Sequence, residues 1–321
     1  MPLITSAFKS QGIFINGHFS TIYSAKIRVK PPLVQTRERL LLKDRDFLDL
    51  DLSLQASTNN QMAVLLHGLE GNAQRSYIKG QGKYLHDRGW DICAVNYRGC
   101  SGEPNKKYSS YNAGKTDDLH EIIVHLTSKY PDHSLVLIGF SLGGNLLLKY
   151  LGEGQAVPKA VKTAVAVSAP LSLRGSLESL SKPINWVYRT SFLMDLKKKY
   201  RQKLIMFEDE LPDHQPTSVK SLLDFDNIYT APAHGFVDAY DYYAKNSSRQ
   251  FVPNIQIPVL ILNALNDSFL SRDCYPFEFA SDAKNIYLET PKTGGHVGFY
   301  QQGPHFYNEK RAFEFINEIL N

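Results

Sequence analysis

The five residues Gly139-Phe-Ser-Leu-Gly143 constrain this chain more than any other stretch. An apolar segment rich in β-forming residues, 134–138, leads into them, and a helical pattern, 144–151, follows. A serine on a sharp turn between a strand and a helix is lifted into a cleft, where its hydroxyl can attack a substrate. The glycines keep bulky side chains out of the turn. Ser141 is therefore the predicted nucleophile of a catalytic site.

Short apolar segments alternate with helical patterns on both sides of this turn. Strands that are apolar throughout and are separated by helices indicate a mostly parallel, doubly wound α/β sheet. Such sheets bind ligands at the carboxyl ends of their strands. The predicted strands cover 62–66, 90–95, 135–138, 163–167, 258–262 and 286–288, and the predicted helices cover 76–88, 113–129 and 143–152.

Two more strands precede this alternating pattern, at 37–43 and 47–54. The second alternates apolar and acidic residues, which is the period of a half-exposed strand. We expect the two strands to form an antiparallel edge, with Asp49 and Asp51 on its solvent-exposed face. The chain before residue 37 is expected to be irregular, with a turn at 16–18.

The strand–helix alternation stops between residues 170 and 252. This stretch has helical patterns and several prolines, and it is too long for a loop. It predicts a helical cap inserted over the strand ends, with residues 1–169 and 253–321 forming the core. Most of its apolar residues are expected to pack the cap onto the core, and a minority to line a substrate channel. The basic run at 197–203 is expected to be a solvated helix face, with contact to a membrane surface as the alternative.

Composition excludes several classes of protein. The chain has 321 residues, of which 43% are hydrophobic and 21% charged, which fits a globular protein with a substantial core. A net charge of +4 is too small to favour nucleic acid as a partner. Three cysteines without metal-ligand spacing favour free thiols, a reducing compartment and thus a cytoplasmic location, and no metal or cofactor is predicted. No signal peptide or membrane-spanning segment is predicted, and the oligomeric state is left open.

A catalytic serine needs a general base and an acid that orients the base. The acid is expected after a late strand. Asp267 lies in the polar turn that follows the strand at 258–262, at the predicted carboxyl edge of the sheet. Asp273 and Asp282 are the alternatives, but both lie further into the following segment.

The base is expected after the next strand. His296 lies in Thr293-Gly-Gly-His-Val-Gly-Phe299, where glycines permit a tight loop that carries the imidazole over the nucleophile. His305 and His234 are weaker candidates, because one lies at the start of the last predicted helix and the other in the cap. His18 is expected to be structural, because it precedes the serine.

Two backbone amides are predicted to form an oxyanion hole. One is that of Leu142, which follows the nucleophile. The other is expected in the loop His67-Gly-Leu-Glu-Gly71, where Leu69 is the best candidate. His67 itself is expected to brace this loop by hydrogen bonding rather than to act in catalysis.

With these residues in place, the sequence resembles the α/β-hydrolase superfamily, and within it the YheT-like group. That group includes ABHD-type lipases and esterases and the yeast medium-chain ethyl-ester synthases and esterases. The order serine, aspartate, histidine is the one this fold uses. The stretches that carry the resemblance are 67–71, 96–105, 139–145, 230–236, 266–267 and 294–299.

The resemblance implies hydrolysis of short- to medium-chain acyl esters or lipids through an acyl-serine, with Ser141, Asp267 and His296 as the triad. Two alternatives stay open. One is an acyltransferase that passes the same acyl group to an alcohol, and the other is a binding protein without turnover. A His-x-x-x-x-Asp pattern linked to alcohol transfer matches His86 and Asp91, but a structural role is favoured for both. Arg98 and Glu103, in the loop at 96–105, are also expected to be structural.

Overall fold

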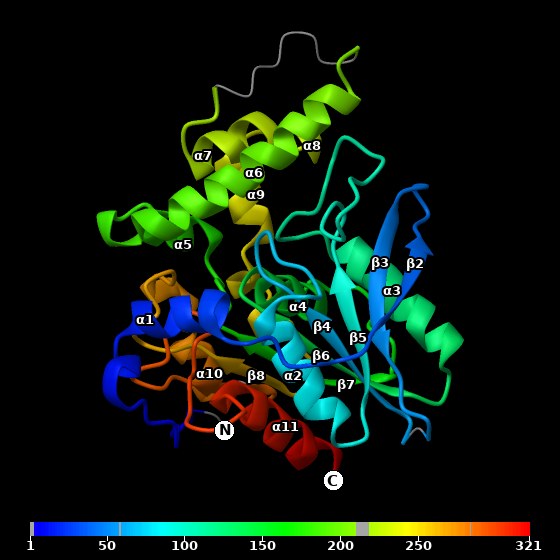
Figure 1. The fold of residues 1–321 in the computed structure, drawn as a ribbon, viewed down its shortest axis with the longest axis vertical. Helices are drawn as coiled ribbons and strands as arrows, with labels where there is room; N and C mark the ends of the chain where they lie inside the picture. The colour runs from blue at the N-terminus through cyan, green and yellow to red at the C-terminus, as the bar shows by residue number, and fades with distance from the viewer. Residues whose placement is uncertain (1–2, 58, 210–217, 283) are drawn as a thin grey trace.

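The structure is a computed structural model that describes residues 3–57, 59–209, 218–282 and 284–321; the side chains of 280–282 are not described. Its centre is one sheet with strand order β1-β9-β8-β7-β6-β4-β5-β3-β2 (Figure 1). Every neighbouring pair is parallel except those that β3 makes with β2 and β5. The strands are β1 (Leu3–Ile4), β2 (Thr36–Leu41), β3 (Phe47–Ser53), β4 (Gln61–Leu66), β5 (Asp91–Asn96), β6 (Ser134–Phe140), β7 (Val161–Val167), β8 (Val259–Leu262) and β9 (Ile286–Glu289).

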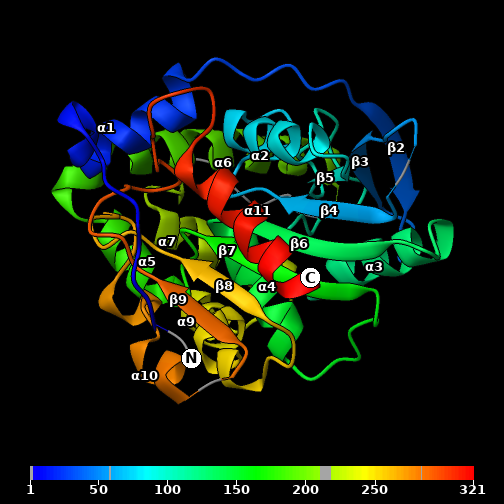
Figure 2. The same ribbon diagram turned by 90° about the horizontal axis from the view of Figure 1, so that it is seen from below.

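Helices cover both faces of the sheet, so the predicted fold class is confirmed (Figure 2). Alternate residues of β4 show why: Val64 belongs to the hydrophobic cluster on one face and Leu65 to the cluster on the other. The first cluster is completed by α3 (Thr116–Lys129) and α4 (Leu142–Gly152), and the second by α2 (Ser76–His86) and α11 (Tyr307–Leu320). A strand buried on both sides needs apolar residues at every position, and this sequence supplies them.

The antiparallel edge forms as predicted, but its acidic residues are not exposed. Asp49 and Asp51 are 1% and 2% exposed, because β3 lies between β2 and β5 and arginines on β2 cover the carboxylates. Arg39 donates to both oxygens of Asp49 at 2.8 and 3.0 Å, and Arg37 to both oxygens of Asp51 at 2.7 and 3.1 Å. The expectation of a solvated face was therefore wrong, because the paired charges allow burial.

The N-terminal segment is also more ordered than predicted. The residues expected to form a turn begin helix α1 (Gly17–Ile22), and the Asn16 side chain caps it by accepting from the amide of Phe19 at 3.1 Å. A 3₁₀ turn, η1 (Gly12–Ile15), precedes α1, and a π-helical turn, η2 (Tyr23–Ile27), follows it.

Between β7 and β8 the described residues contain helices and no strand. Helix α6 runs beside α7 and α8 above the carboxyl ends of the strands (Figure 1). A separate hydrophobic cluster around Tyr200 and Phe225 holds α6 and α7 together. The elements are α5 (Leu173–Leu180), η3 (Pro183–Asn185), α6 (Trp186–Met206), α7 (Leu222–Phe225), η5 (Asp226–Thr230), α8 (Ala231–Ala233), α9 (Ala239–Asn246), η6 (Ser248–Gln250) and η7 (Val252–Asn254).

Two short elements complete the described chain between β8 and β9, namely η8 (Arg272–Cys274) and α10 (Phe277–Asp282). None of the helices in the described ranges is both long and apolar enough to cross a bilayer.

Candidate active site

Ser141 lies in the sharp turn between β6 and α4. Its backbone has φ 54° and ψ −121°, a conformation that costs a non-glycine residue free energy and that clusters at functional sites. A Cβ atom on Gly143 would lie 2.5 Å from the carbonyl oxygen of Leu66, and one on Gly139 would collide with the carbonyl of Gly143. Only glycine fits at both positions, in agreement with the sequence argument.

The structure brings Ser141, His296 and Asp267 together. His296 Nε2 lies 2.8 Å from Ser141 Oγ, and His296 Nδ1 lies 2.8 Å from Asp267 Oδ2. The other oxygen of Asp267 accepts from the amide of Phe269 at 2.9 Å, and the Phe269 ring stacks on the imidazole with centroids 4.2 Å apart. Asp267 and His296 are 4% and 9% exposed, so their pairing is shielded from water.

The loop that carries His296 is held by the N-terminal segment. Thr21 Oγ1 accepts from the His296 amide at 2.8 Å, and Ser24 Oγ donates to the Val297 carbonyl at 2.8 Å. Asn266, next to the acid, accepts from the Gly295 amide at 2.9 Å. Sequence reasoning missed Thr21 and Ser24, because nothing in a segment without clear periodicity signals contact with a loop some 270 residues later.

The alternative acids and bases do not join this cluster. Asp273 is exposed in η8, and the side chain of Asp282 lies outside the described residues. His234 lies 2.8 and 2.9 Å from the backbone carbonyls of Thr230 and Ser110, and so links η5 to the loop after β5. His305 lies 3.8 Å from Glu309 at the start of α11.

The predicted oxyanion loop lies against the nucleophile, because a Cβ on Gly68 would be 3.0 Å from the Cβ of Ser141. Within the described chain, the Leu69 and Leu142 amides donate to no protein acceptor. Three other amides of the loop are engaged: those of Gly68, Glu70 and Gly71 donate to Tyr77 Oη at 3.2 Å, Tyr111 Oη at 2.8 Å and the Gly68 carbonyl at 3.0 Å.

His67 stabilises this loop from within the core. It is fully buried, with Nδ1 2.7 Å from the Gly68 carbonyl and Nε2 accepting from the Tyr97 amide at 3.3 Å. Burial lowers the pKa of His67 to about 3, so the ring is neutral at pH 7. These bonds agree with the bracing role predicted for it.

Two cavities meet at Ser141. The inner cavity lies between the core and helices α5, α6, α7 and α9, and the outer cavity lies between α1, η2 and α6. With their open mouths included, they enclose about 1060 and 1080 Å³ of empty space. Both are bordered by Leu69, Glu70, Ser141, Phe192, Phe269 and His296.

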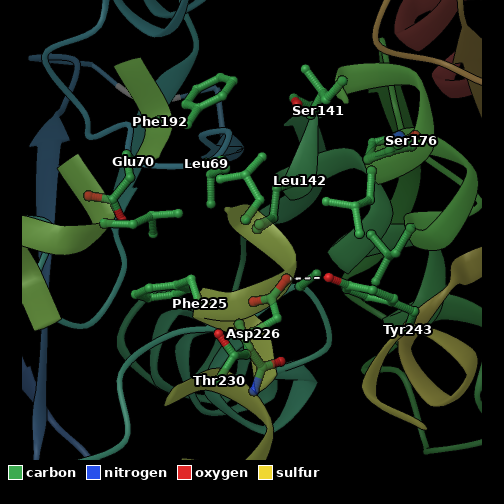
Figure 3. Close-up of a pocket in the computed structure, with 18 of the residues that line it drawn as sticks. Leu69, Glu70, Ser141, Leu142, Ser176, Phe192, Phe225, Asp226, Thr230 and Tyr243 are labelled. Carbon is green, nitrogen blue, oxygen red and sulfur yellow. Dashed lines mark hydrogen bonds between the residues drawn. The ribbon is translucent and has the colours of Figure 1, made fainter. Parts of the chain in front are cut away.

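The inner cavity is apolar near the serine and has a carboxyl group at its far end (Figure 3). Leu69 and Leu142 lie between Ser141 and Asp226 in this view. Asp226 accepts a hydrogen bond from Tyr243 Oη at 2.6 Å, and burial raises the pKa of Asp226 to about 6. The apolar wall is made by Leu173, Leu177, Leu180, Leu196, Leu222 and Phe225.

The basic run on α6 is not a wholly solvated face, which corrects the prediction. Lys203 is 3% exposed and donates to the carbonyl of Asn105 at 2.8 Å; burial lowers its pKa to about 8. Lys199 lies 3.0 Å from Glu70 and 2.9 Å from the sulfur of Cys100. Both lysines point inward because α6 lies across the loops that follow β4 and β5.

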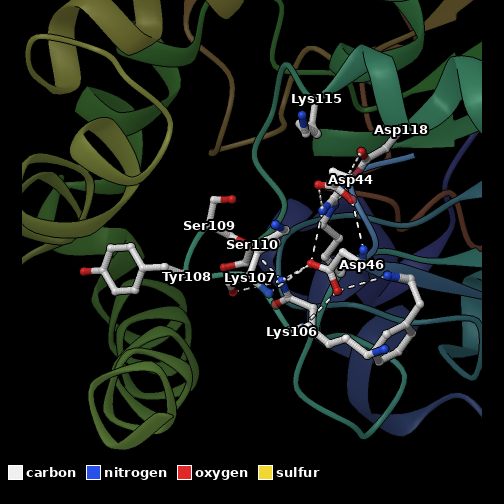
Figure 4. Close-up of polar contacts among 12 residues, drawn as sticks. Asp44, Asp46, Lys106, Lys107, Tyr108, Ser109, Ser110, Lys115 and Asp118 are labelled. Carbon is white, nitrogen blue, oxygen red and sulfur yellow. Dashed lines mark hydrogen bonds and ion pairs between the residues drawn. The ribbon is translucent and has the colours of Figure 1, made fainter. Parts of the chain in front are cut away.

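The loop after β5 is held by a buried charge network (Figure 4). Arg98 donates to both oxygens of Asp118 at 2.6 and 2.7 Å, and lies 2.6 and 3.1 Å from Asp44 and Asp46. Glu103 pairs with Arg39 at 2.7 Å. These contacts are structural, as predicted for Arg98 and Glu103.

The His-x-x-x-x-Asp pattern lies at the opposite edge of the sheet from Ser141. His86 ends α2, and Asp91 is the first residue of β5, whereas Ser141 follows the last residue of β6. Asp91 accepts from the Gln55 amide at 2.6 Å and lies 2.9 Å from His133. The contacts of Asp91 and the position of the pattern therefore indicate a structural role.

Comparison with known proteins places this fold in a class. A model of the α/β hydrolase fold family matches residues 64–302, and the chain belongs to that family. It is 34% identical over 292 residues to the putative esterase YheT of Escherichia coli, a match that covers 89% of this chain and 85% of the relative. It is 31% identical to human phospholipase ABHD3, over 94% of this chain and 75% of that protein.

More distant matches agree. The monoacylglycerol lipase of Saccharomyces cerevisiae is 29% identical over 78% of this chain and 57% of its own length. The structure of the Pyrococcus furiosus esterase Pf2001 superposes with a TM-score of 0.61 at 18% identity, over 91% of this chain and 98% of that one, which shows the shared fold. The chain is therefore a hydrolase of the esterase and lipase type, and the predicted resemblance is confirmed.

Proposed function

We propose that this protein hydrolyses carboxylic esters of short- to medium-chain acyl groups, or lipids, through an acyl-serine on Ser141. One observation carries the proposal: a continuous chain of short contacts from Asp267 through His296 to the hydroxyl of Ser141. The contacts have the length that a nucleophile, its base and the orienting acid require.

In this mechanism, His296 Nε2 takes the proton from Ser141 as the oxygen attacks the ester carbonyl. Asp267 accepts from Nδ1–H, which fixes the tautomer of the ring and stabilises the imidazolium that forms. The imidazolium then gives its proton to the departing alcohol, and water repeats the sequence to release the acid. The stacked Phe269 ring keeps the imidazole in one plane throughout.

The tetrahedral oxyanion needs donors that are already in place. We assign this role to the amides of Leu69 and Leu142, each contributing about 3 kcal/mol to lowering the barrier. What supports the assignment is that these two amides are unengaged next to Ser141 while their neighbours in the loop at 67–71 are bonded.

We assign the inner cavity to the acyl chain and the outer cavity to the alcohol. The outer cavity is lined by Val297 and Tyr188 on the side of His296, from which the leaving alcohol must receive its proton. The inner cavity is reached past Leu142 and is mostly apolar, as an acyl chain requires. We propose that residues 170–252 act as the cap that closes the inner cavity, while 1–169 and 253–321 form the core.

Transfer of the acyl group to an alcohol is the second candidate. The outer cavity favours it, because an alcohol seated there would be next to the acyl-serine. One relative, 27% identical over 90% of this chain, is named medium-chain fatty acid ethyl ester synthase/esterase 2. A cytoplasmic location remains our prediction for either activity.

The test is hydrolysis of p-nitrophenyl esters from acetate to palmitate by the wild type and by Ser141→Ala. We expect a rate that depends on Ser141 and peaks at one chain length. A purified variant that retains turnover would overturn the assignment of the nucleophile. Ethanol added in steps separates the two candidates, because transfer predicts ethyl ester formation at modest ethanol concentrations. Absence of both turnover and labelling of Ser141 by a fluorophosphonate would favour a binding protein.

A further inference from the structure

The outer cavity reaches the surface between two segments that are far apart in sequence. Ile22 at the end of α1 and Val187 on α6 both line it, and they are 38% and 48% exposed. Tyr188 fixes the two segments to each other by donating to the His18 carbonyl at 3.2 Å. The mouth of this cavity is thus flanked by apolar side chains on both sides.

The apolar exposure extends outward from the mouth. Trp186 and Ile184, next to Val187 in the chain, are 60% and 64% exposed. We call these four residues, Ile22, Ile184, Trp186 and Val187, the apolar rim. Exposure of large apolar side chains costs free energy in water, and a cluster of them at the opening of a cavity marks an interaction surface.

The two stretches of chain that carry the apolar rim contain basic but no acidic residues. No residue from 3 to 37 and none from 179 to 194 is acidic. Four lysines in these stretches, Lys9, Lys26, Lys30 and Lys182, are exposed, and Lys26 lines the outer cavity. The first acidic residue after the second stretch is Asp195, which is exposed and lines the outer cavity about two turns of α6 beyond Val187, at the end of the cavity away from Trp186 along the helix. Apolar side chains flanked by lysines are the composition that binds the interface of an anionic bilayer.

We propose that the apolar rim docks on a lipid surface that carries anionic head groups, so that the outer cavity opens directly onto the lipid. The inference rests on the proposed function for its purpose, since an apolar ester dissolved in a bilayer would then reach Ser141 without crossing water. It also moves the membrane contact away from the basic run on α6, where Lys199 and Lys203 are engaged inside the protein.

The chain carries its own reporter for this docking. It has two tryptophans, of which Trp90 is 1% exposed in the core and Trp186 is in the apolar rim. Insertion of the rim into lipid therefore shifts the tryptophan emission to shorter wavelength through Trp186 alone. The shift and co-sedimentation are measured on the full chain with phosphatidylcholine vesicles, with and without phosphatidylglycerol.

We expect binding to vesicles that contain phosphatidylglycerol, with the emission shift, and weaker binding at high salt or to phosphatidylcholine alone. The double variant Ile184→Ser, Trp186→Ser should bind at least tenfold more weakly, and Ile184→Ser alone keeps the reporter and should bind a few-fold more weakly. Val34→Ser is the matched control, because Val34 is 89% exposed but does not line the outer cavity. That control should bind like the wild type.

Three results would overturn the docking surface: no binding to either vesicle, equal binding by the double variant and the wild type, or a dimer that the double variant converts to monomer. The last result would make a second copy of the chain the occupant. Hydrolysis of water-soluble p-nitrophenyl acetate is measured in parallel. If that hydrolysis depends on Ser141 while vesicle binding is absent, the docking surface is overturned and the proposed function stands. If the protein binds vesicles but does not hydrolyse the ester, the docking surface stands and the proposed function is overturned.

Discussion

The two cavities that meet at Ser141 differ in how they are built. The inner cavity is walled by helices α5, α6, α7 and α9, has no exposed side chain in its lining, and ends at the carboxyl of Asp226. The outer cavity is bordered by the N-terminal segment and one face of α6, and it opens among exposed side chains. A wall of buried side chains is fixed in shape and selects the group that enters by its size, whereas a wall of exposed side chains can move aside and tolerates variation. This difference predicts strict selection of the acyl chain and loose selection of the alcohol.

The largest predicted loss of activity should be the same for esters that differ in the acyl group and for esters that differ in the alcohol. Asp267→Asn leaves the shape of both unchanged but favours the wrong tautomer of His296, so kcat/KM should fall on the order of 10⁴-fold for every ester. Kinetics with a long-acyl ester and with a bulky-alcohol ester measure this. Asp273→Asn is the control and should retain activity, because Asp273 is exposed in η8. Unequal losses for the two esters would show that the cavities do not share one reacting centre.

A smaller loss of activity should distinguish the inner cavity from the outer one. Leu177 lines only the inner cavity, so Leu177→Trp should lower kcat/KM for p-nitrophenyl decanoate roughly 100-fold and that for the acetate less than threefold. The chain-length profile of the variant against the wild type measures this shift. A profile that falls uniformly would place the acyl chain elsewhere.

The corresponding substitution in the outer cavity is at Ser191, which lines that cavity but not the inner one. Ser191→Trp should lower kcat/KM about tenfold for octanoate esters of bulky alcohols and leave ethyl octanoate little changed. The loss is smaller than that from Leu177→Trp because exposed side chains border the outer cavity and can move aside for the alcohol. If the decanoate preference changes instead, the two assignments are reversed.

The smallest effect concerns stability and belongs to the inner cavity alone. The pKa of Asp226 is about 6 in the folded protein, against 3.8 ordinarily, because the carboxyl is buried. The folded state therefore holds this proton more tightly, and the free energy of unfolding falls as pH rises from about 4 to about 6. Asp226→Asn should gain about 1–2 kcal/mol relative to the wild type between pH 4.5 and pH 7, measured by urea unfolding. An equal difference between the two proteins at both pH values would contradict this.

Much of the fold could be predicted from the sequence, and the reasons are local. The strand around 135–138 and the helix after Ser141 are set by runs of apolar residues and by two glycines that admit no Cβ. The three residues that meet at the site could be chosen because each follows a strand, and parallel strands bring their carboxyl ends to one edge.

What could not be predicted depends on partners distant in sequence. The burial of Asp49 required Arg39 on the neighbouring strand, and an alternating pattern by itself indicates only a half-exposed strand. The inward direction of Lys203 required a carbonyl nearly 100 residues earlier, on the loop after β5. Helix α1 lacked a strong apolar period, so its stability comes from packing that the sequence does not display.

The bonds from Thr21 and Ser24 to the His296 loop have a consequence for how the enzyme matures. Thr21 and Ser24 are synthesised long before the histidine loop that they support, so their contacts with it form only after some 270 further residues have been made. The loop that carries the base therefore depends on contacts between segments some 270 residues apart, and the pairing of β1 with β9 is another such contact. Cleavage between η2 and β2 with loss of the segment before the cut should therefore lower activity while leaving most of the sheet intact, because β1 is the one strand of the described sheet in that segment.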